Sequence, residues 1–190
     1  MVFGSMPNDG QNLLLTTAEK KSLISVEPAA EKWIRPLLGA EEFINGTERW
    51  CLWLKDASPA DIEALPLVKE RVEKVRLLRL SSSRPATQRL AENPHLFGEV
   101  RHPQSGNYIL VPRVSSERRS YVPVGFLSSD TISSDANQMI PNATLYEFGI
   151  VASEMHNDWM RTVAGRLKSD YRYSATLVYR LFAFKGVADF

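Results

Sequence analysis

The spacing of apolar residues changes along the chain, and this change restricts the possible folds more than any other feature. From Leu67 to Leu78 the apolar side chains recur at the intervals of a helix. Beyond Pro103 they fall into short runs separated by turn residues, which is typical of strands. Helices followed by a series of short strands favour an α+β fold over a fold in which the two alternate.

The N-terminal half is expected to be mainly helical. Residues 16–38 have a helical pattern that prolines interrupt, because proline lacks an amide proton and restricts the residue before it. A short strand is expected at Trp50–Leu54. Ser58 followed by Pro59 is typical of a helix start, and Pro66 opens a second helix with a basic outer side.

The C-terminal half is expected to form a sheet and then a helix. Leu145–Leu167 has enough apolar residues at helical spacing for one long helix. Pro123 restricts one of the preceding strands to an edge or a bulge. The expected strands are Tyr108–Val111, Tyr121–Phe126, Thr131–Ser133 and Gln138–Ile140. The predicted architecture is therefore α+β: N-terminal helices, a central antiparallel β-sheet with projecting loops, and a long closing helix.

The length of 190 residues and a hydrophobic fraction of 44% suit one domain with a sizeable core. Residues 1–15, which begin with a stretch rich in Gly, Asn and Pro, are expected to form an N-terminal tail. The domain is expected to span residues 16–179. Residues 180–190 are expected to be a divergent C-terminal tail.

The basic residues are unevenly distributed, although the formal net charge is only +1. Residues 69–119 carry eleven basic and five acidic side chains, a net charge of +6, whereas residues 1–68 and 120–190 carry −4 and −1. A surface that contacts nucleic-acid phosphates requires a basic block of this kind. A solvated helix surface without a partner is the alternative.

No pattern in the chain predicts a self-contained active site. Phosphate-binding loops and the HExxH and CxxC motifs are missing, so we expect no catalytic, cofactor-binding or metal site and no enzyme activity of this chain alone. Cys51 is expected in the core, His102 on the surface and His156 packed in the closing helix. No apolar run is long enough to span a membrane, so we expect no membrane partner and a cytoplasmic location.

The segment from Val111 to Tyr121 is the strongest candidate for contacts with DNA bases. It runs from a strand into a polar loop and back into a strand, so its side chains would project from a narrow hairpin. Arginine binds guanine bidentately, glutamate accepts from cytosine, and serine suits phosphate oxygens. Glu117 and Arg119 would share one face if the strand persisted, and a charged hairpin with a local Glu–Arg ion pair is the alternative. The candidates for base readout are Arg113, Ser115, Ser116, Glu117, Arg118 and Arg119.

Two further basic clusters are candidates for phosphate contacts. One lies where the helix from Pro66 ends, with serine hydroxyls between arginines, and the other follows the closing helix. A serine-rich linker is the alternative for the first cluster, and simple packing is expected for Tyr171 and Tyr173 of the second. The candidates are Arg76, Arg79, Ser81, Ser82, Arg84, Arg89, Lys168 and Arg172.

Five stretches of the chain are distinctive: Phe43–Gly46 with Arg49–Leu54, Leu96–Glu99, Pro112–Arg119, Ile140–Thr144 and Gly165–Ser174. In this order they resemble the region that follows the methyltransferase core in MmeI-like enzymes, and the resemblance runs from about Gly4 to Tyr179. MmeI-like enzymes are single-chain type II restriction–modification proteins and their relatives. They methylate adenine N6 with S-adenosylmethionine.

The resemblance implies a sequence-specific target-recognition domain of a DNA (adenine-N6) methyltransferase, with double-stranded DNA as its partner. The Asn-Pro-Pro-Tyr-type motif of the family's catalytic core is missing and Arg180–Phe190 departs from the family, so we expect a truncated chain without that core. S-adenosylmethionine is then a cofactor of the full-length family, and a separate methyltransferase core could be a second partner. The alternative is a protein-interaction module left from a truncated methyltransferase gene, with an apolar surface around Trp33, Trp50 or Trp53.

Overall fold

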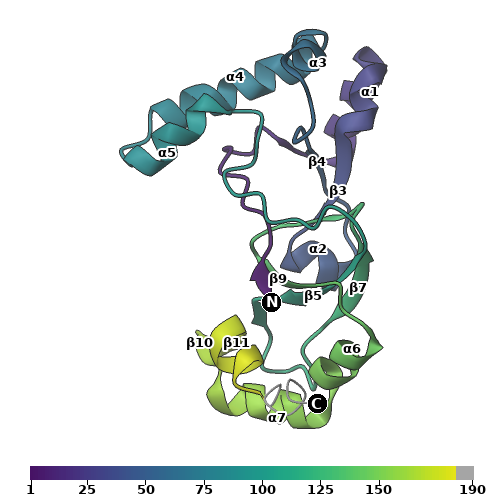
Figure 1. The fold of residues 1–190 in the computed structure, drawn as a ribbon, viewed down its shortest axis with the longest axis vertical. Coiled ribbons are helices and arrows are strands. Elements are labelled where there is room, and N and C mark those ends of the chain that lie inside the picture. The colour runs from purple at the N-terminus through teal and green to yellow at the C-terminus, as the bar shows by residue number, and fades with distance from the viewer. Residues whose placement is uncertain (183–190) are drawn as a thin grey trace.

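The computed structural model describes residues 1–182 and shows an α+β fold, as predicted. Residues 183–190, most of the expected C-terminal tail, lie outside the described residues. The described residues form three small β-sheets, which follow one another along the long axis of the molecule, while two helices extend as an arm near one end (Figure 1). Within residues 1–182, no helix combines the length and the apolar character that a membrane crossing requires.

The first sheet contains strands from both halves of the chain. Its strand β4 (Trp50–Leu52) lies between β2 (Leu14–Leu15) and β3 (Ile34–Leu38) and is antiparallel to both. Strand β8 (Ile132–Ser133) adds to the other edge of β3 in parallel. This last pairing ties the C-terminal half of the chain to the N-terminal half.

Side-chain caps define two helix starts in the first half, near residue 16 and at Ser58, as the sequence predicts, but the expected helical pattern over residues 16–38 is wrong in its last part, because Ile34–Leu38 forms β3. Helix α1 (Thr17–Val26) begins after Thr16, whose hydroxyl accepts a hydrogen bond from the Glu19 amide while the Glu19 carboxylate accepts one from Thr16. Ser58 caps α3 (Pro59–Glu63) in the same way. The other helices of this half are the 3-10 helices Pro28–Trp33 and Leu90–Glu92, α2 (Ala40–Asn45), α4 (Pro66–Leu80) and α5 (Pro85–Arg89).

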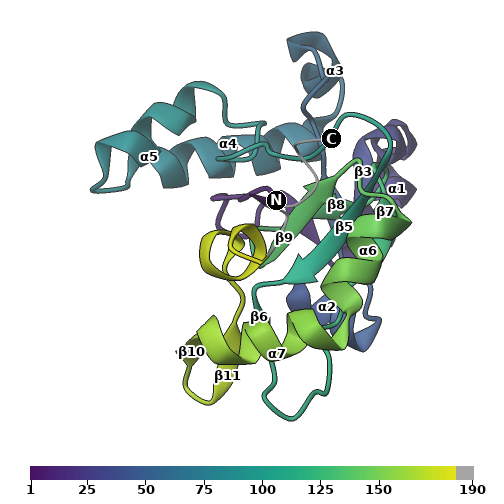
Figure 2. The same ribbon diagram turned by 60° about the horizontal axis from the view of Figure 1, so that its bottom comes forward.

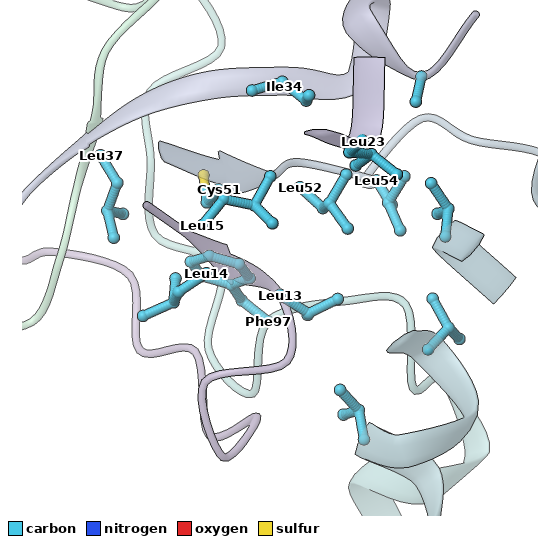
Figure 3. Packing of buried hydrophobic residues seen from close by; sticks show 14 of the residues in the cluster. Leu13, Leu14, Leu15, Leu23, Ile34, Leu37, Cys51, Leu52, Leu54 and Phe97 are labelled. Atoms are coloured by element: carbon cyan, nitrogen blue, oxygen red, sulfur yellow. The ribbon is translucent and has the colours of Figure 1, made fainter. Parts of the chain in front are cut away.

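The first hydrophobic core lies between this sheet and the helices α1 and α4. Helix α4 contributes Val68, Val72 and Val75. Figure 3 shows leucines of β2 and β4 converging with Phe97. Cys51 is fully buried in this core, as predicted.

The second sheet lies at the centre of the molecule and is antiparallel throughout. Strand β5 (Asn107–Pro112) lies between β7 (Gly125–Ser128) and β9 (Asn137–Pro141). Strand β1 (Val2–Phe3) adds to the free edge of β9. The paired strands β1 and β9 are thus more than 130 residues apart in the sequence.

Strand β5 is buried on both faces and separates two cores. Alternate side chains of a strand point to opposite faces of its sheet. On one face Tyr108 and Leu110 pack with Phe43 of α2, and on the other Ile109 and Val111 pack with residues of the C-terminal helices. Burial on both faces explains why the run from 108 to 111 is continuously apolar.

The expected long closing helix is divided into two. Helix α6 (Leu145–Ala152) ends at Ser153, where the backbone is extended, and α7 (Glu154–Val163) begins directly after it. The Ser153 hydroxyl donates to the Ile150 carbonyl at 2.7 Å and accepts from the His156 amide at 3.1 Å. The prediction of one helix is wrong because the capping serine competes with the helical spacing of the apolar residues around it.

The expected strand at Tyr121–Phe126 is displaced toward the C-terminus. The Val122 amide donates to Oδ1 of the buried Asn157 on α7 at 2.8 Å, and Pro123 has no amide proton to offer a neighbouring strand. Pairing with β5 therefore begins only at Gly125.

Residues 1–15 are part of the fold and not the expected tail. Strand β1 pairs with β9, and the Gly4 amide donates to the Asn137 carbonyl at 3.1 Å. Only glycine permits this approach, because a β-carbon at Gly4 would lie 2.0 Å from the Ser134 carbonyl oxygen. Leu13 is fully buried in the first core.

Arg79 is a buried structural residue, so its prediction as a phosphate contact is wrong. It is 1% exposed, at the C-terminal end of α4. Its guanidinium donates at 2.8–3.2 Å to five backbone carbonyls, which belong to Pro7, Asn8, Leu90, Asn93 and Leu96. Arg79 thereby holds the segments around residues 7–8 and 90–96 against α4 and supplies hydrogen bonds to their backbone carbonyls.

Two histidines are buried. His102 is buried and not on the surface as expected: its Nε2 lies 2.8 Å from the Ser129 carbonyl oxygen, and its ring meets that of Trp53 edge to face. His156 is packed inside the C-terminal half, as predicted, with Nε2 2.8 Å from the Tyr173 hydroxyl.

Replacing Arg79 with methionine should lower the free energy of unfolding by about 3–5 kcal/mol, because buried carbonyls lose their donors. The matched control is Arg76→Met on the same helix, which removes only a solvent-exposed ion pair with Glu73 and should have a much smaller effect. Urea denaturation measures both. Equal losses for the two variants would contradict the structural role of Arg79.

Burial lowers the pKa of His156 from 6.5 to about 4. Between these values the unfolded chain binds a proton that the folded chain does not, so the free energy of unfolding should fall as the pH is lowered from 6.5 to 4. The maximum slope for one group is about 1.4 kcal/mol per pH unit. His156→Gln should make the pH dependence in this window shallower, whereas an unchanged slope would show that His156 is not its source.

Candidate nucleic-acid interface

The third sheet joins two segments that the sequence separately predicts to contact DNA. Strand β6 (Val114–Ser115) pairs antiparallel with β11 (Asp170–Arg172), which forms a hairpin with β10 (Gly165–Leu167). Figure 2 shows these strands together, beside α7. The base-readout segment therefore lies next to the predicted phosphate contacts Lys168 and Arg172.

Ser115 supports this sheet and does not belong to its exposed edge. It lies opposite Tyr171 and is 4% exposed, so its prediction as a base contact is wrong. Sequence alone does not show this burial, because it arises from pairing with a distant strand. Tyr171 and Tyr173 are packed in the core, as predicted.

The chain turns sharply after β6. The Arg119 amide donates to the Ser116 carbonyl at 3.1 Å, and the Arg118 amide donates to the Ser116 hydroxyl at 3.3 Å. The strand therefore ends at Ser115, and the expectation that Glu117 and Arg119 share a strand face is wrong. The turn instead exposes Glu117, Arg118 and Arg119 in succession. Residues 116–119 are called the reading loop below.

The neighbouring hairpin holds the reading loop in place. The Glu117 amide donates to Oδ1 of Asp170 at 3.3 Å, and the Arg166 guanidinium lies 3.7 Å from the Glu117 carboxylate. Arg166 is itself oriented by the ring of Tyr171, 3.8 Å from its centroid, and by the Ser169 carbonyl, 2.7 Å away. The ion pair of Glu117 is thus formed with the hairpin and not inside the loop.

The edge formed by the reading loop and the hairpin is strongly cationic. Arg118, Arg119, Lys168 and Arg172 are exposed, and within residues 1–182 their side chains have no hydrogen bond or ion pair. Lys168 occupies the hairpin turn with a φ of 55°. Four unpaired cations at one edge favour an anionic partner.

A groove of about 550 Å³ lies beside this edge and is lined by four arginines. Arg113 and Arg172 are among the predicted residues, whereas sequence reasoning did not assign a role to Arg101 and placed Arg180 in a divergent tail. In the sequence, only the positive charge of Arg101 and Arg180 points to a role in binding. Their closeness to the other two arginines arises from strand pairing between distant parts of the chain, which the sequence does not show.

The remaining predicted phosphate contacts lie elsewhere. They are on or between α4 and α5, in the arm at the opposite end of the molecule from β10 and β11 (Figure 1). Their contact with phosphates stays a prediction. The residues are Arg76, Ser81, Ser82, Arg84 and Arg89.

Comparisons with known proteins agree over almost the whole chain. The family model described as the MmeI target recognition domain matches residues 1–186. DNA methyltransferase A of Bacillus subtilis (strain 168) is 43% identical over 180 residues, which make up 95% of this chain and 20% of that protein. A solved structure of the Type IIL restriction-modification enzyme MmeI in complex with DNA is 47% identical, with a TM-score of 0.91. The match covers 94% of the present chain and 24% of the MmeI chain.

This chain therefore spans between a fifth and a quarter of the length of these relatives. The sequence similarity covers the residues of the hydrophobic cores and also those of the cationic edge. The chain therefore shares its sequence, and not only its fold, with these relatives. The chain belongs to the family of MmeI target recognition domains.

Proposed function

We propose that this chain is a sequence-specific, double-stranded-DNA-binding domain that recognises the target of a DNA (adenine-N6) methyltransferase. The observation that carries this proposal is the pairing of β6 with β11, which joins the reading loop to a cationic hairpin. The relatives are a DNA methyltransferase and a restriction-modification enzyme in complex with DNA, which supports DNA as the ligand.

The reading loop has the side chains that distinguish base pairs in the major groove. Arg118 and Arg119 are free to bond guanine bidentately, and the Glu117 carboxylate can accept from cytosine N4. Ser116 uses its hydroxyl and carbonyl to form the turn. We therefore assign base readout to Glu117, Arg118 and Arg119, with Ser116 as the residue that positions them.

The hairpin supplies sequence-independent affinity. Lys168 and Arg172 are exposed beside the loop, where they neutralise phosphates on either side of the bases being read. The basic arm of α4 and α5 is a separate surface, which a duplex long enough to reach it would contact through Arg84 and Arg89.

The methyl transfer itself belongs to the rest of a longer protein or to a separate chain. A catalytic core of that kind would bind S-adenosylmethionine, and the present domain would position the adenine for it. Because the ligand is cellular DNA, we place the protein in the cytoplasm.

The alternative role, a protein-interaction module, rests on an apolar surface of exposed tryptophans. Trp33, Trp50 and Trp53 are partly buried and pack against the first core. Lys20 and Lys32 also lie over two of these rings. The three residues therefore do not form the surface on which this alternative depends.

Selection from a random duplex library should yield a preferred sequence for this chain. Arg118→Ala and Arg119→Ala should each relax the preference at one base position, by about 1–3 kcal/mol of discrimination. The control Lys21→Ala removes an exposed cation of α1 and should leave the preference intact. A wild-type chain that selects no sequence would contradict the proposed function.

Exchanging charges in the reading loop, with Glu117→Lys and Arg119→Asp, should change the preferred base at one position and leave the others unchanged. The control is Arg166→Gln, which removes the ion-pair partner of Glu117 but no reading side chain. This control should weaken binding without altering the preferred base. If Arg166→Gln changes the preference as the exchange does, Glu117 acts by shaping the loop and not by reading a base.

A further inference from the structure

The groove beside the reading loop is lined by four arginines and no carboxylate. Arg101, Arg113, Arg172 and Arg180 face it, and none of its lining residues within the described part of the chain is Asp or Glu. Three of the four have no carboxylate partner among the described residues, and like charges without a counter-charge repel one another, so the arrangement favours binding of an anion.

Two of these arginines are held at fixed positions beside Phe3. Phe3 of β1 is 41% exposed, and the guanidiniums of Arg113 and Arg101 lie 4.8 Å and 5.7 Å from its ring centroid. Arg113 also donates to the Asp135 carbonyl at 3.0 Å. Arg101 forms an ion pair with Glu99, which lowers its contribution to the charge of the groove.

The other two arginines are free to bind. Arg172 on β11 and Arg180 at the end of the π-helix Ala175–Arg180 have no hydrogen bond or ion pair within residues 1–182. Both are exposed. The groove therefore combines a preorganised pair of guanidiniums with an unpaired, adjustable pair.

We propose that this groove binds the sugar–phosphate backbone of one DNA strand and is the main phosphate anchor of the domain. This inference rests on the proposed function and adds Arg101 and Arg180 to the interface. It also changes the role of Arg113, because its guanidinium is tied into the groove wall and a bond to a base at the loop tip would break that tie. Arg113 is a phosphate contact, and the exposed arginines of the reading loop read the bases.

The floor of the groove suits the other parts of the backbone. Phe3 and Leu177 offer apolar surface to deoxyribose rings. Buried Gln138, opposite Phe3 in the sheet, donates its amide to the Tyr173 carbonyl at 3.2 Å, while its amide oxygen has no partner among the described residues. A water that donates to this oxygen and to a phosphate oxygen would satisfy both.

The test measures how DNA affinity depends on salt for Arg180→Gln and for Arg172→Gln with Arg180→Gln. Each lost phosphate contact should lower the slope of log K against log salt concentration by about 0.9, which is roughly eight-fold in affinity at 0.1 M salt. The preferred sequence should stay the same, because phosphates carry no base identity. Both side chains are exposed, and thermal unfolding checks that the variants remain folded.

The matched control removes two exposed cations that do not line the groove, Lys21 of α1 and Arg35 of β3, by Lys21→Gln with Arg35→Gln. This variant should keep the wild-type slope. A second readout uses duplexes with one neutral methylphosphonate. At least one position at which this change weakens wild-type binding should have little effect on the Arg172→Gln, Arg180→Gln chain.

The outcomes separate the two proposals. A folded double variant that keeps the wild-type salt slope overturns the anchor and leaves sequence recognition intact. A wild-type chain that binds duplexes without preference, and loses slope in the double variant, overturns sequence recognition and supports the anchor. A wild-type chain that binds no DNA overturns both.

Discussion

The pairing of β6 with β11 is the contact on which the whole interface depends. Only two residue pairs form it, Tyr171 with Ser115 and Arg172 with Val114. Without it, the loop between β5 and β7 would be a mobile excursion from the central sheet, and a bidentate arginine contact tolerates little misplacement. The loop is held at its start by this pairing, at its side by Asp170 and at its end by Asn157. Its cationic side chains are thus presented from a fixed backbone.

The parts of the fold that depend on local signals can be predicted from the sequence. The helix that begins near residue 16, the helix start at Ser58 and the strand 108–111 all have signals within a few residues. The break at Ser153 has such a signal too, but a serine within an apolar helical run does not show by itself whether it caps or continues a helix. Strand register and pairing depend on residues far apart, so neither the parallel pair of β3 and β8 nor the role of residues 1–15 could be predicted.

The candidate site shows the same limit for individual side chains. An arginine is suited to bind a phosphate, but equally suited to bind backbone carbonyls. The Arg79 side chain is buried beneath α4, where it donates hydrogen bonds to carbonyls of two loops. The Arg172 side chain, by contrast, points from its strand into solvent. Residue type therefore predicts the kind of partner, and tertiary structure decides which partner is within reach. The base-reading and hairpin residues were predicted separately, but only the structure shows them as one edge.

The place of β1 in the central sheet affects how such a domain is made. Its hydrogen bonds run to β9, so Val2 and Phe3 have no strand partner until residues near 139 have been synthesised. At the usual speed of a ribosome this delay is on the order of ten seconds, during which chaperones can reach both apolar residues. Phe3 orients Arg101 and Arg113 only after this late closure. In a nascent or misfolded chain both the ring and the arginines are present, but the ring is not yet placed beside them, and only the finished domain presents the full groove.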